Sequence, residues 1–126
     1  MSNTEDEVDD ELVRAWLDHH SNEGVEDVDT EWAMLRLQEY VLFEPGLAWN
    51  VVARVISRAW NSWQATMIGA GPLESLLFHY GTEYLSQLEL LVDRGSFFPE
   101  VIAAVWASDP EVRQRILRLK RETTVE

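Results

Sequence analysis

The sequence predicts an all-α protein in which about seven short helices pack as a compact, antiparallel, solenoid-like array of helical hairpins. Apolar residues recur every three or four positions through most of the chain, which is the spacing of amphipathic helices and not of strands. Short segments with glycine, proline or a capping residue separate these stretches. Because the connections contain only a few residues, we expect successive helices to lie antiparallel to their neighbours.

The length and composition fit one globular domain. The chain has 126 residues, of which 46% are hydrophobic, so it can bury a core without metals or disulfides. We expect residues 7–122 to form a single helical domain, preceded by a disordered acidic N-terminus over residues 1–6. The absence of cysteine excludes disulfides and thiolate chemistry. The acidic start is unlike a signal peptide and no apolar run approaches the ~20 residues of a membrane span, so we expect a cytoplasmic protein with no membrane partner.

The ends of the first two helices are marked by acidic, capping and helix-breaking residues. One is predicted from about Glu7 to His20, and its early acidic residues suit the positive end of a helix dipole. The other begins after a cap at Asp29 or Thr30 and ends at Glu44-Pro45-Gly46. We expect the second helix to bury a broad apolar stripe, formed by Trp32, Leu35, Tyr40, Leu42 and Phe43.

The third helix, from Leu47 to about Trp63, has the clearest period of 3.6 residues in the chain. Its predicted buried face consists of Leu47, Val51, Val52, Val55, Ile56, Ala59, Trp60 and Trp63. Trp49 lies off this stripe, and we expect it to be exposed as an interface anchor, with Trp63 as a second candidate.

A glycine-rich segment interrupts the pattern at the middle of the chain. Two glycines followed by Pro72, at what reads as a first helical position, indicate a tight turn and then a short helix that ends at Gly81. We therefore expect a sharp reversal of the chain between two helical halves. Glu74, in the first turn of the new helix, is expected to cap it.

The remaining helices start at capping residues. We predict one from Thr82 to about Asp93, one after Ser96 and a last one after Ser108-Asp109-Pro110-Glu111, ending by Thr123. The side chains expected to point inward are Tyr84, Leu85, Leu88, Leu91, Val92, Phe97, Phe98, Val101, Ile102, Val105, Trp106, Val112, Ile116 and Leu119.

Gly-Ala-Gly-Pro-Leu-Glu at 69–74, the Leu-rich helix after it and the downstream Ala104-Val105-Trp106 resemble a bacterial family of small helical domains of unknown function. The resemblance covers roughly residues 30–120. Its signature positions are Gly69, Gly71, Pro72 and Glu74. The resemblance implies a mostly helical fold and no catalytic residues, so it transfers no mechanism.

Charge is distributed unevenly along the chain. The net charge is −13, and residues 1–31 hold twelve acidic residues against the single base Arg14. We call this segment the acidic head. Residues 112–121 carry five bases and no acid. The acidic head is suited to attracting a basic protein, while the net charge disfavours direct binding of nucleic acid.

These features favour a non-enzymatic, acidic protein-binding module, of the immunity or inhibitor kind, that neutralises a basic partner protein and needs no cofactor. The predicted partner-binding residues are Asp9, Asp10, Glu11, Trp16, Asp18, Glu26, Asp27, Asp29 and Trp32. Four alternatives remain open. In the first, the head imitates nucleic acid and inhibits a protein that binds DNA or RNA. In the second and third, it pairs with the basic tail (residues 112–121), either within the chain or in a second copy as a homodimer. In the fourth, the head is only a solubilising surface.

Two groups of residues have side chains that could carry out chemistry. A small-molecule enzyme site at the glycine-rich turn would use Glu74, His79 and Trp63, although Glu74 and His79 are spaced to lie on different helical faces. His19 and Glu23 lie four residues apart, but adjacent histidines point in different directions and no further ligand has metal-site spacing. We expect a solvated helix end there, with no metal site and no catalytic residue in the chain.

Overall fold

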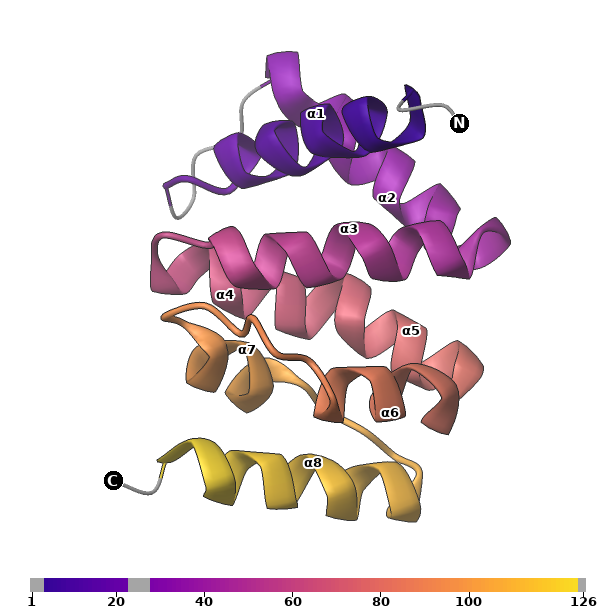
Figure 1. Cartoon of the computed structure of the whole chain (residues 1–126), viewed down its shortest axis with the longest axis vertical. Coiled ribbons are helices and arrows are strands. Elements are labelled where there is room, and N and C mark those ends of the chain that lie inside the picture. Colours follow the sequence, from indigo (N-terminus) through magenta and orange to yellow (C-terminus); the bar gives the residue numbers. More distant parts are fainter. Residues whose placement is uncertain (1–3, 23–27, 125–126) are drawn as a thin grey trace.

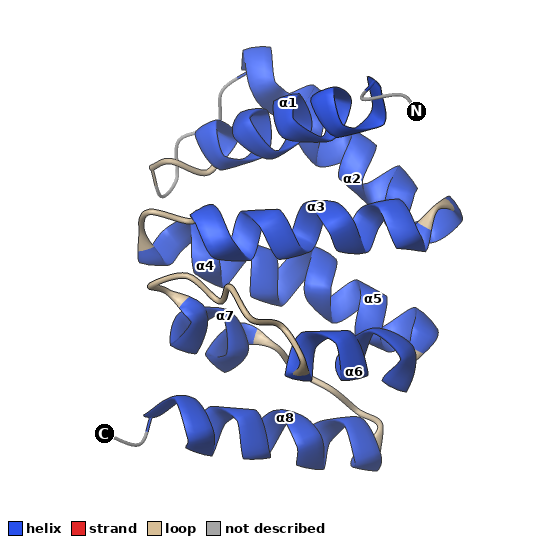
Figure 2. Cartoon of the chain, in the orientation of Figure 1, coloured by secondary structure: helices blue, strands red, loops and turns tan. Residues whose placement is uncertain are grey.

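The computed structural model describes residues 4–22 and 28–124. Within them the chain forms eight α-helices, the 3-10 turn η1 and the π-helical segment η2, and no strand (Figures 1 and 2). The predicted all-α class is confirmed. The elements in order are α1 (Thr4–His19), η1 (Val28–Thr30), α2 (Glu31–Phe43), α3 (Pro45–Arg58), α4 (Ser62–Ile68), η2 (Gly69–Leu73), α5 (Glu74–Tyr80), α6 (Thr82–Glu89), α7 (Phe98–Ala104) and α8 (Pro110–Thr124).

The helices stack in layers along the long axis of the molecule (Figure 1). Helices α1 and α2 form one end, α3 spans the molecule beneath them, and α8 forms the other end. Helix α1 packs on α2 and α3, α4 packs on α7, and α7 packs on α8. None of the helices in the described part of the chain combines the length and apolar character needed to cross a bilayer.

The N-terminal helix is longer than the sequence predicts. It begins at Thr4, so it includes residues 4–6 of the segment expected to be disordered, while residues 1–3 lie outside the described residues. Helix α6 is shorter than predicted and ends at Glu89.

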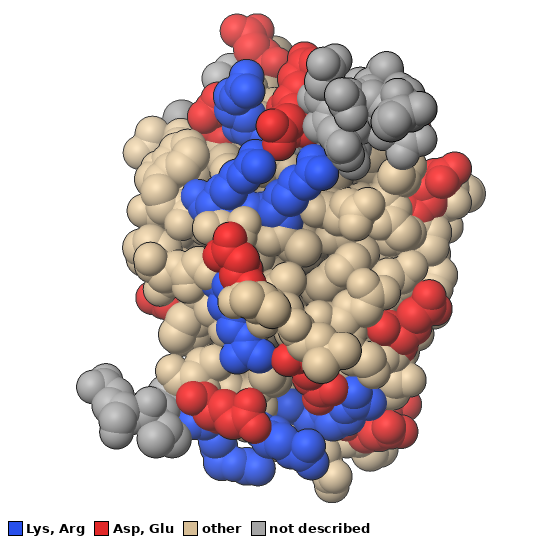
Figure 3. Space-filling view, in the orientation of Figure 1, with Lys and Arg blue, Asp and Glu red and all other residues tan. Residues whose placement is uncertain are grey.

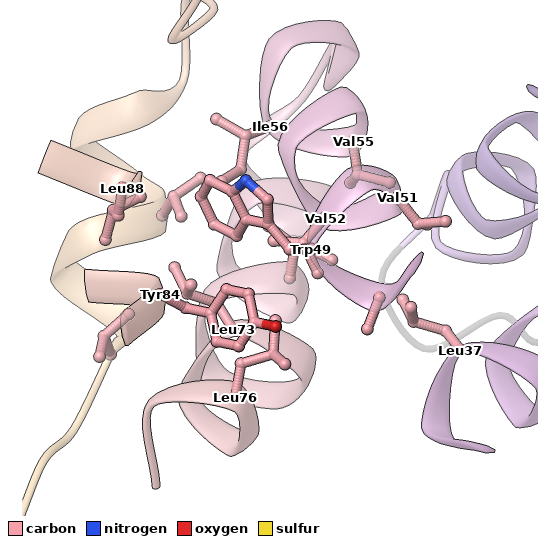
Figure 4. Close-up of a cluster of buried hydrophobic side chains, with 14 of the residues drawn as sticks. Leu37, Trp49, Val51, Val52, Val55, Ile56, Leu73, Leu76, Tyr84 and Leu88 are labelled. Carbon is pink, nitrogen blue, oxygen red and sulfur yellow. The ribbon is translucent and has the colours of Figure 1, made fainter. Parts of the chain in front are cut away.

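The core is centred on α3, whose predicted buried face is largely confirmed. Val52, Val55 and Ile56 are fully buried, and Trp49 lies beside them against Tyr84 with ring centroids 6.2 Å apart (Figure 4). The prediction that Trp49 is exposed is wrong, because α3 packs against neighbours on more than one side and a single apolar stripe underestimates what it buries. Trp49 keeps only 8% of its surface exposed.

The predicted sharp reversal at Gly69-Ala70-Gly71-Pro72 is also wrong. Helix α4 continues through η2 into α5, and the backbone stays right-handed helical at Ile68 (φ −68°, ψ −37°) and at Leu73 (φ −64°, ψ −47°). The Glu74 N–H donates to the Gly69 carbonyl five residues earlier, as in a π-helix. A proline lacks the amide hydrogen of a helix and its ring crowds the preceding turn, and a locally widened helix accommodates both defects.

Gly69 serves the packing between helices. A Cβ at this position would overlap the carbonyl oxygen of Val101 on α7 and lie 3.2 Å from the Cβ of Ala104. Gly71 differs, because a Cβ there would have no atom within 4 Å. Neither glycine has positive φ, which among the described residues occurs only at Gly81 and Gly95.

Several apolar residues predicted to be inward are exposed. They are Leu35, Leu42, Phe43, Trp60, Val92 and Trp106, with exposed fractions from 50% to 95%. Helix α2 lies at the end of the stack and buries only a narrow stripe of Ala33, Leu37 and Val41. Trp60, Val92 and Trp106 lie beyond the last residues of α3, α6 and α7, where the helical period no longer applies.

Candidate functional site

The acidic head is partly neutralised from within the fold. Arg58 on α3 donates to the Asp10 carboxylate at 2.9 Å, and Arg54 lies 3.8 Å from the same oxygen. The hydrogen bond and charge of Arg58 hold the pKa of Asp10 below its usual value. Figure 3 shows basic side chains directly below the acidic end of the molecule. The arginines that compensate the head thus come from α3, whereas the basic tail helix α8 lies at the opposite end of the stack (Figure 1).

The basic residues of α8 also have partners inside the fold. The Arg115 Nε donates to Glu89 at 2.9 Å, and a second contact reaches Glu111. The hydrogen bond from Arg115 lowers the pKa of Glu89. Arg113 donates to the carbonyl groups of Ala107 and Ser108. Part of the positive charge of the tail therefore holds α8 against its neighbours.

Apart from Asp10, which is paired with Arg58, the predicted partner-binding residues divide into three groups. Glu11, Asp18 and Asp29 are exposed, and Trp32 is 37% exposed. Trp16 is only 1% exposed, so its assignment as a surface anchor is wrong, because its helical face packs into the core. Glu26, Asp27 and the side chain of Asp9 lie outside what the structure describes.

An exposed apolar surface adjoins these acidic residues. We define the α2 apolar face as Trp32, Leu35, Leu42 and Phe43. A groove runs along part of it and is lined by Trp32, Leu35, Arg36, Gln38, Glu39 and Leu42. Sequence periodicity placed these residues in the core, and the end position of α2 in the stack leaves them uncovered.

A second cavity lies where the end of α1, helix α2 and the η2–α5 segment meet. It has a volume of about 330 Å³, and we call it the His20 pocket. Its lining residues are Trp16, His20, Met34, Gln38, Val41, Leu42, Met67, Gly71, Pro72, Ser75 and His79. The Tyr80 hydroxyl donates to the Val41 carbonyl at 2.7 Å and ties α5 to α2 beside this cavity.

The two adjacent histidines are buried, contrary to the predicted solvated helix end. His19 is 2% exposed, and its Nδ1 lies 3.2 Å from Thr30 Oγ1. His20 is 7% exposed and packs against Trp16 with ring centroids 4.2 Å apart. They are buried because the end of α1 is covered by η1 and α2. Across the residues that the structure describes, no group of three acidic, histidine or cysteine side chains is arranged to hold a metal.

Burial of His20 has a consequence for stability. Desolvation, with a smaller contribution from His19, lowers the pKa of His20 from 6.5 to about 4. The folded chain therefore binds fewer protons than the unfolded chain between these values, and the free energy of unfolding falls as the pH falls from about 6.5 towards 4.

Because of this residue, we expect the free energy of unfolding to drop by about 1–2 kcal/mol between pH 7 and pH 4.5. This is less than the full pKa shift implies, because solvent in the pocket partly screens the charged imidazole. Urea titrations of the wild type and of His20→Phe at both pH values measure the effect. The variant should lose less stability than the wild type by that amount, and equal losses would contradict the burial of an uncharged imidazole.

Gln64 positions the end of α1, and sequence patterns did not single it out. Its side chain is fully buried, its Nε2 donates to the Leu17 carbonyl at 2.8 Å, and its Oε1 accepts from the Trp60 N–H at 2.8 Å. Asn61, the N-cap of α4, donates from Nδ2 to the Ser21 carbonyl at 2.9 Å. These bonds fix the last turn of α1, which carries the Trp16 and His20 wall of the pocket.

The predicted enzyme constellation does not converge on one cavity. Glu74 does not cap its own helix, because α5 continues from η2, and instead its Oε1 accepts from the Trp106 N–H at 2.8 Å. Glu74 lines a different groove, beside Phe78, Trp106 and Asp109. His79 lines the His20 pocket, and neither of these two cavities is lined by Trp63.

The chain matches a model of a known protein family. A model described as a family of unknown function (DUF6869) matches residues 19–124. The matched span includes Gly69–Glu74, and all of α1 before His19 precedes it. No curated protein and no solved structure matches the chain. The signature role of residues 69–74 and a bacterial origin stay predictions.

Proposed function

The chain belongs to this family of unknown function (DUF6869), and we propose that it is a non-enzymatic protein-binding module of the immunity or inhibitor kind. It docks a basic partner protein on the end of the stack formed by α1 and α2. The observation that carries this proposal is the α2 apolar face, an exposed apolar surface on a helix that borders the acidic head.

The apolar face supplies the anchors. Phe43 is 77% exposed, Leu42 is 53% exposed and Trp32 is 37% exposed, and all three lie on α2. Grouped exposed apolar side chains mark interaction sites, and here the ion-paired Arg36 and Glu39 lie among them in the same groove. Aromatic residues contribute most to binding where a partner excludes water from them. The exposed set replaces the buried Trp16 as the source of binding energy.

The charges select the partner. Glu11, Asp18, Asp29 and Glu31 are exposed on α1, η1 and α2, which lie at this end of the stack, and we call them the acidic rim. Two copies of the chain would bring two strongly acidic heads together, which opposes pairing through this end. A basic protein is attracted to the same end, and its association is accelerated by the net charge of −13.

The test is quantitative capture from an extract of the native host, using the full chain as bait. One variant, Trp32→Ala with Phe43→Ser, removes apolar anchors, and its control is Trp106→Ala with Val92→Ser. A second variant neutralises part of the rim through Glu11→Gln, Asp18→Asn and Glu31→Gln. Its control neutralises equally exposed acids elsewhere, through Glu83→Gln, Asp93→Asn and Glu122→Gln.

We expect the wild type and both controls to capture the same basic protein, and both docking variants to capture at least about tenfold less of it. The association rate should fall as salt rises, because exposed charges are screened. Inhibition of the activity of the captured protein tests the neutralising role, and competition by DNA or RNA would indicate nucleic-acid imitation instead. Equal capture by the wild type and both docking variants would refute the docking face, as would a captured protein that is acidic.

A further inference from the structure

The His20 pocket lies beside the proposed docking face, with which it shares Leu42, and its construction indicates a ligand of its own. Its volume of about 330 Å³ lies at the lower end of the range for small-molecule sites. Four parts of the chain form its walls, namely the end of α1, helix α2, the end of α4 and the η2–α5 segment. A cavity at such a junction is the usual place for a bound molecule in a helical protein.

The imidazole of His20 is the polar centre of this pocket. It is 93% buried, since only 7% of the residue is exposed, and it lines the cavity. Its contacts within the described part of the chain are the rings of Trp16 and His19, and neither ring nitrogen has a hydrogen bond to a protein group there. Both nitrogens keep some contact with solvent, so they can be reached from the pocket. A neutral imidazole offers one donor and one acceptor, so a molecule in the pocket can complete either bond.

Gly71 keeps the pocket open. Its φ is not positive, and a Cβ at this position would meet no atom within 4 Å, so neither backbone geometry nor packing requires glycine. Gly71 also lines the cavity, so a larger side chain at this position has open space at the edge of the pocket. Gly69, two residues earlier, is explained by the close approach of α7. The π-helical geometry of η2 presents Gly71 and Pro72 to the pocket, and such segments occur frequently at functional sites.

The lining defines the class of ligand. None of its residues is an aspartate, glutamate, lysine or arginine, and the chain as a whole carries a net charge of −13. An anion would be repelled, and a cation would find no carboxylate in the lining. The rings of Trp16 and His20, the flat face of Pro72 and the thioethers of Met34 and Met67 suit an aromatic molecule.

We infer that the His20 pocket binds a compact, uncharged aromatic molecule whose polar group forms a hydrogen bond with the imidazole of His20. Gly71 sets the depth of the site, and Trp16 forms the wall against which the aromatic ring packs. Trp16 precedes the residues matched by the family, so part of the recognition comes from the N-terminal helix.

Indole serves as the probe, and benzoate serves as an anion of similar size. Titration of the ¹⁵N-labelled full chain, followed by amide chemical shifts, gives the dissociation constant and the place of binding. We expect indole to bind with a dissociation constant of about 1 mM or tighter and to shift residues of α1, η2 and α5. Benzoate is expected to bind at least about tenfold more weakly, because the pocket offers it no positive charge.

Four variants locate the site. Gly71→Leu fills the cavity and should weaken indole binding at least about tenfold, while Gly71→Ala should weaken it about threefold. Gly46→Leu is the matched control, since Gly46 is exposed in the first turn of α3 and an added Cβ there would also meet no atom within 4 Å; this variant should bind indole normally. His20→Phe keeps the aromatic contact with Trp16 but removes both nitrogens, and about fivefold weaker binding is expected.

Trp32→Ala should leave indole binding unchanged, which separates this site from the α2 apolar face. Thermal unfolding of each variant shows whether the fold is intact, and Gly71→Ala keeps the test available if the leucine variant does not fold. Unchanged affinity in Gly71→Ala and His20→Phe would overturn the proposal. So would shifts centred on α2 residues outside the pocket, equal binding of benzoate, or no saturable binding of indole.

Discussion

Replacing Gly69 with alanine is expected to lower the free energy of unfolding by about 2–3 kcal/mol, as for other overpacked core positions. The added methyl group would overlap the backbone oxygen of Val101, lie 3.0 Å from its carbonyl carbon and crowd Ala104. Backbone atoms within a helix cannot rotate out of the way, so α7 must move away from η2. Urea or thermal unfolding of Gly69→Ala measures the loss.

Gly71→Ala is the matched comparison, two residues along the same segment. Its methyl group enters open space, and alanine restricts the unfolded chain more than glycine does, so a gain of about 0.5 kcal/mol or no change is expected. Adding Ala104→Gly to Gly69→Ala relieves only the contact with the Ala104 side chain and should restore less than half of the loss. A Gly69→Ala protein as stable as the wild type would show that α7 does not pack directly on this backbone.

The contrast between these glycines explains why the sequence predicts a chain reversal that the structure does not have. Gly-Ala-Gly-Pro carries the local signals of a tight turn, and glycine with proline favours a turn when no other contact decides. Here tertiary packing decides, because α7 approaches the helix at Gly69 and the pocket lies at Gly71. A glycine required for space and a glycine required for positive φ are indistinguishable in one sequence, so a π-helical segment was read as a reversal of the chain.

The helical class and most of the core follow from periodicity alone. The pattern on α3 correctly identified Val51, Val52, Val55 and Ile56 as buried. Periodicity cannot show how many neighbours a helix has. Periodicity therefore predicts that outer residues of α2, such as Phe43, are buried and that Trp49 is exposed. The structure shows the reverse, because α2 lies at the end of the stack and α3 lies within it.

One element of the candidate pocket was readable from the sequence and was missed. Trp16 and His20 are four residues apart, and side chains at this spacing lie on one face of a helix. Leu12 and Trp16 also recur at this spacing, which places His20 on the apolar side of the helix. The partner walls from α2 and η2 depend on long-range packing and have no local signal.

Removing the buried amide of Gln64 is the second change with a large expected effect. Gln64→Leu has a similar volume but cannot bond to the Leu17 carbonyl or to the Trp60 N–H. Each group left without a partner in a buried site costs about 1–3 kcal/mol, and we expect a total loss of about 3 kcal/mol in the free energy of unfolding. Gln114→Leu, at an exposed position on α8, is the control and should change stability by less than about 0.5 kcal/mol.

Gln64→Glu separates hydrogen bonding from packing. The carboxylate can still accept from the Trp60 N–H, but only its protonated form can donate to the Leu17 carbonyl. Burial favours the protonated form, so this variant should be least stable relative to the wild type at pH 7 and should recover as the pH falls to 5. Denaturant titrations of both proteins at each pH measure the difference.

The same variants connect the stability of the fold to the pocket. The bond from Gln64 to Leu17 holds the turn of α1 that carries Trp16 and His20. If it positions that wall, Gln64→Leu should weaken indole binding at temperatures where the protein is still folded, and Gln64→Glu should regain affinity together with stability at pH 5. Full affinity for indole in a folded Gln64→Leu protein would show that the wall is held by its apolar contacts alone.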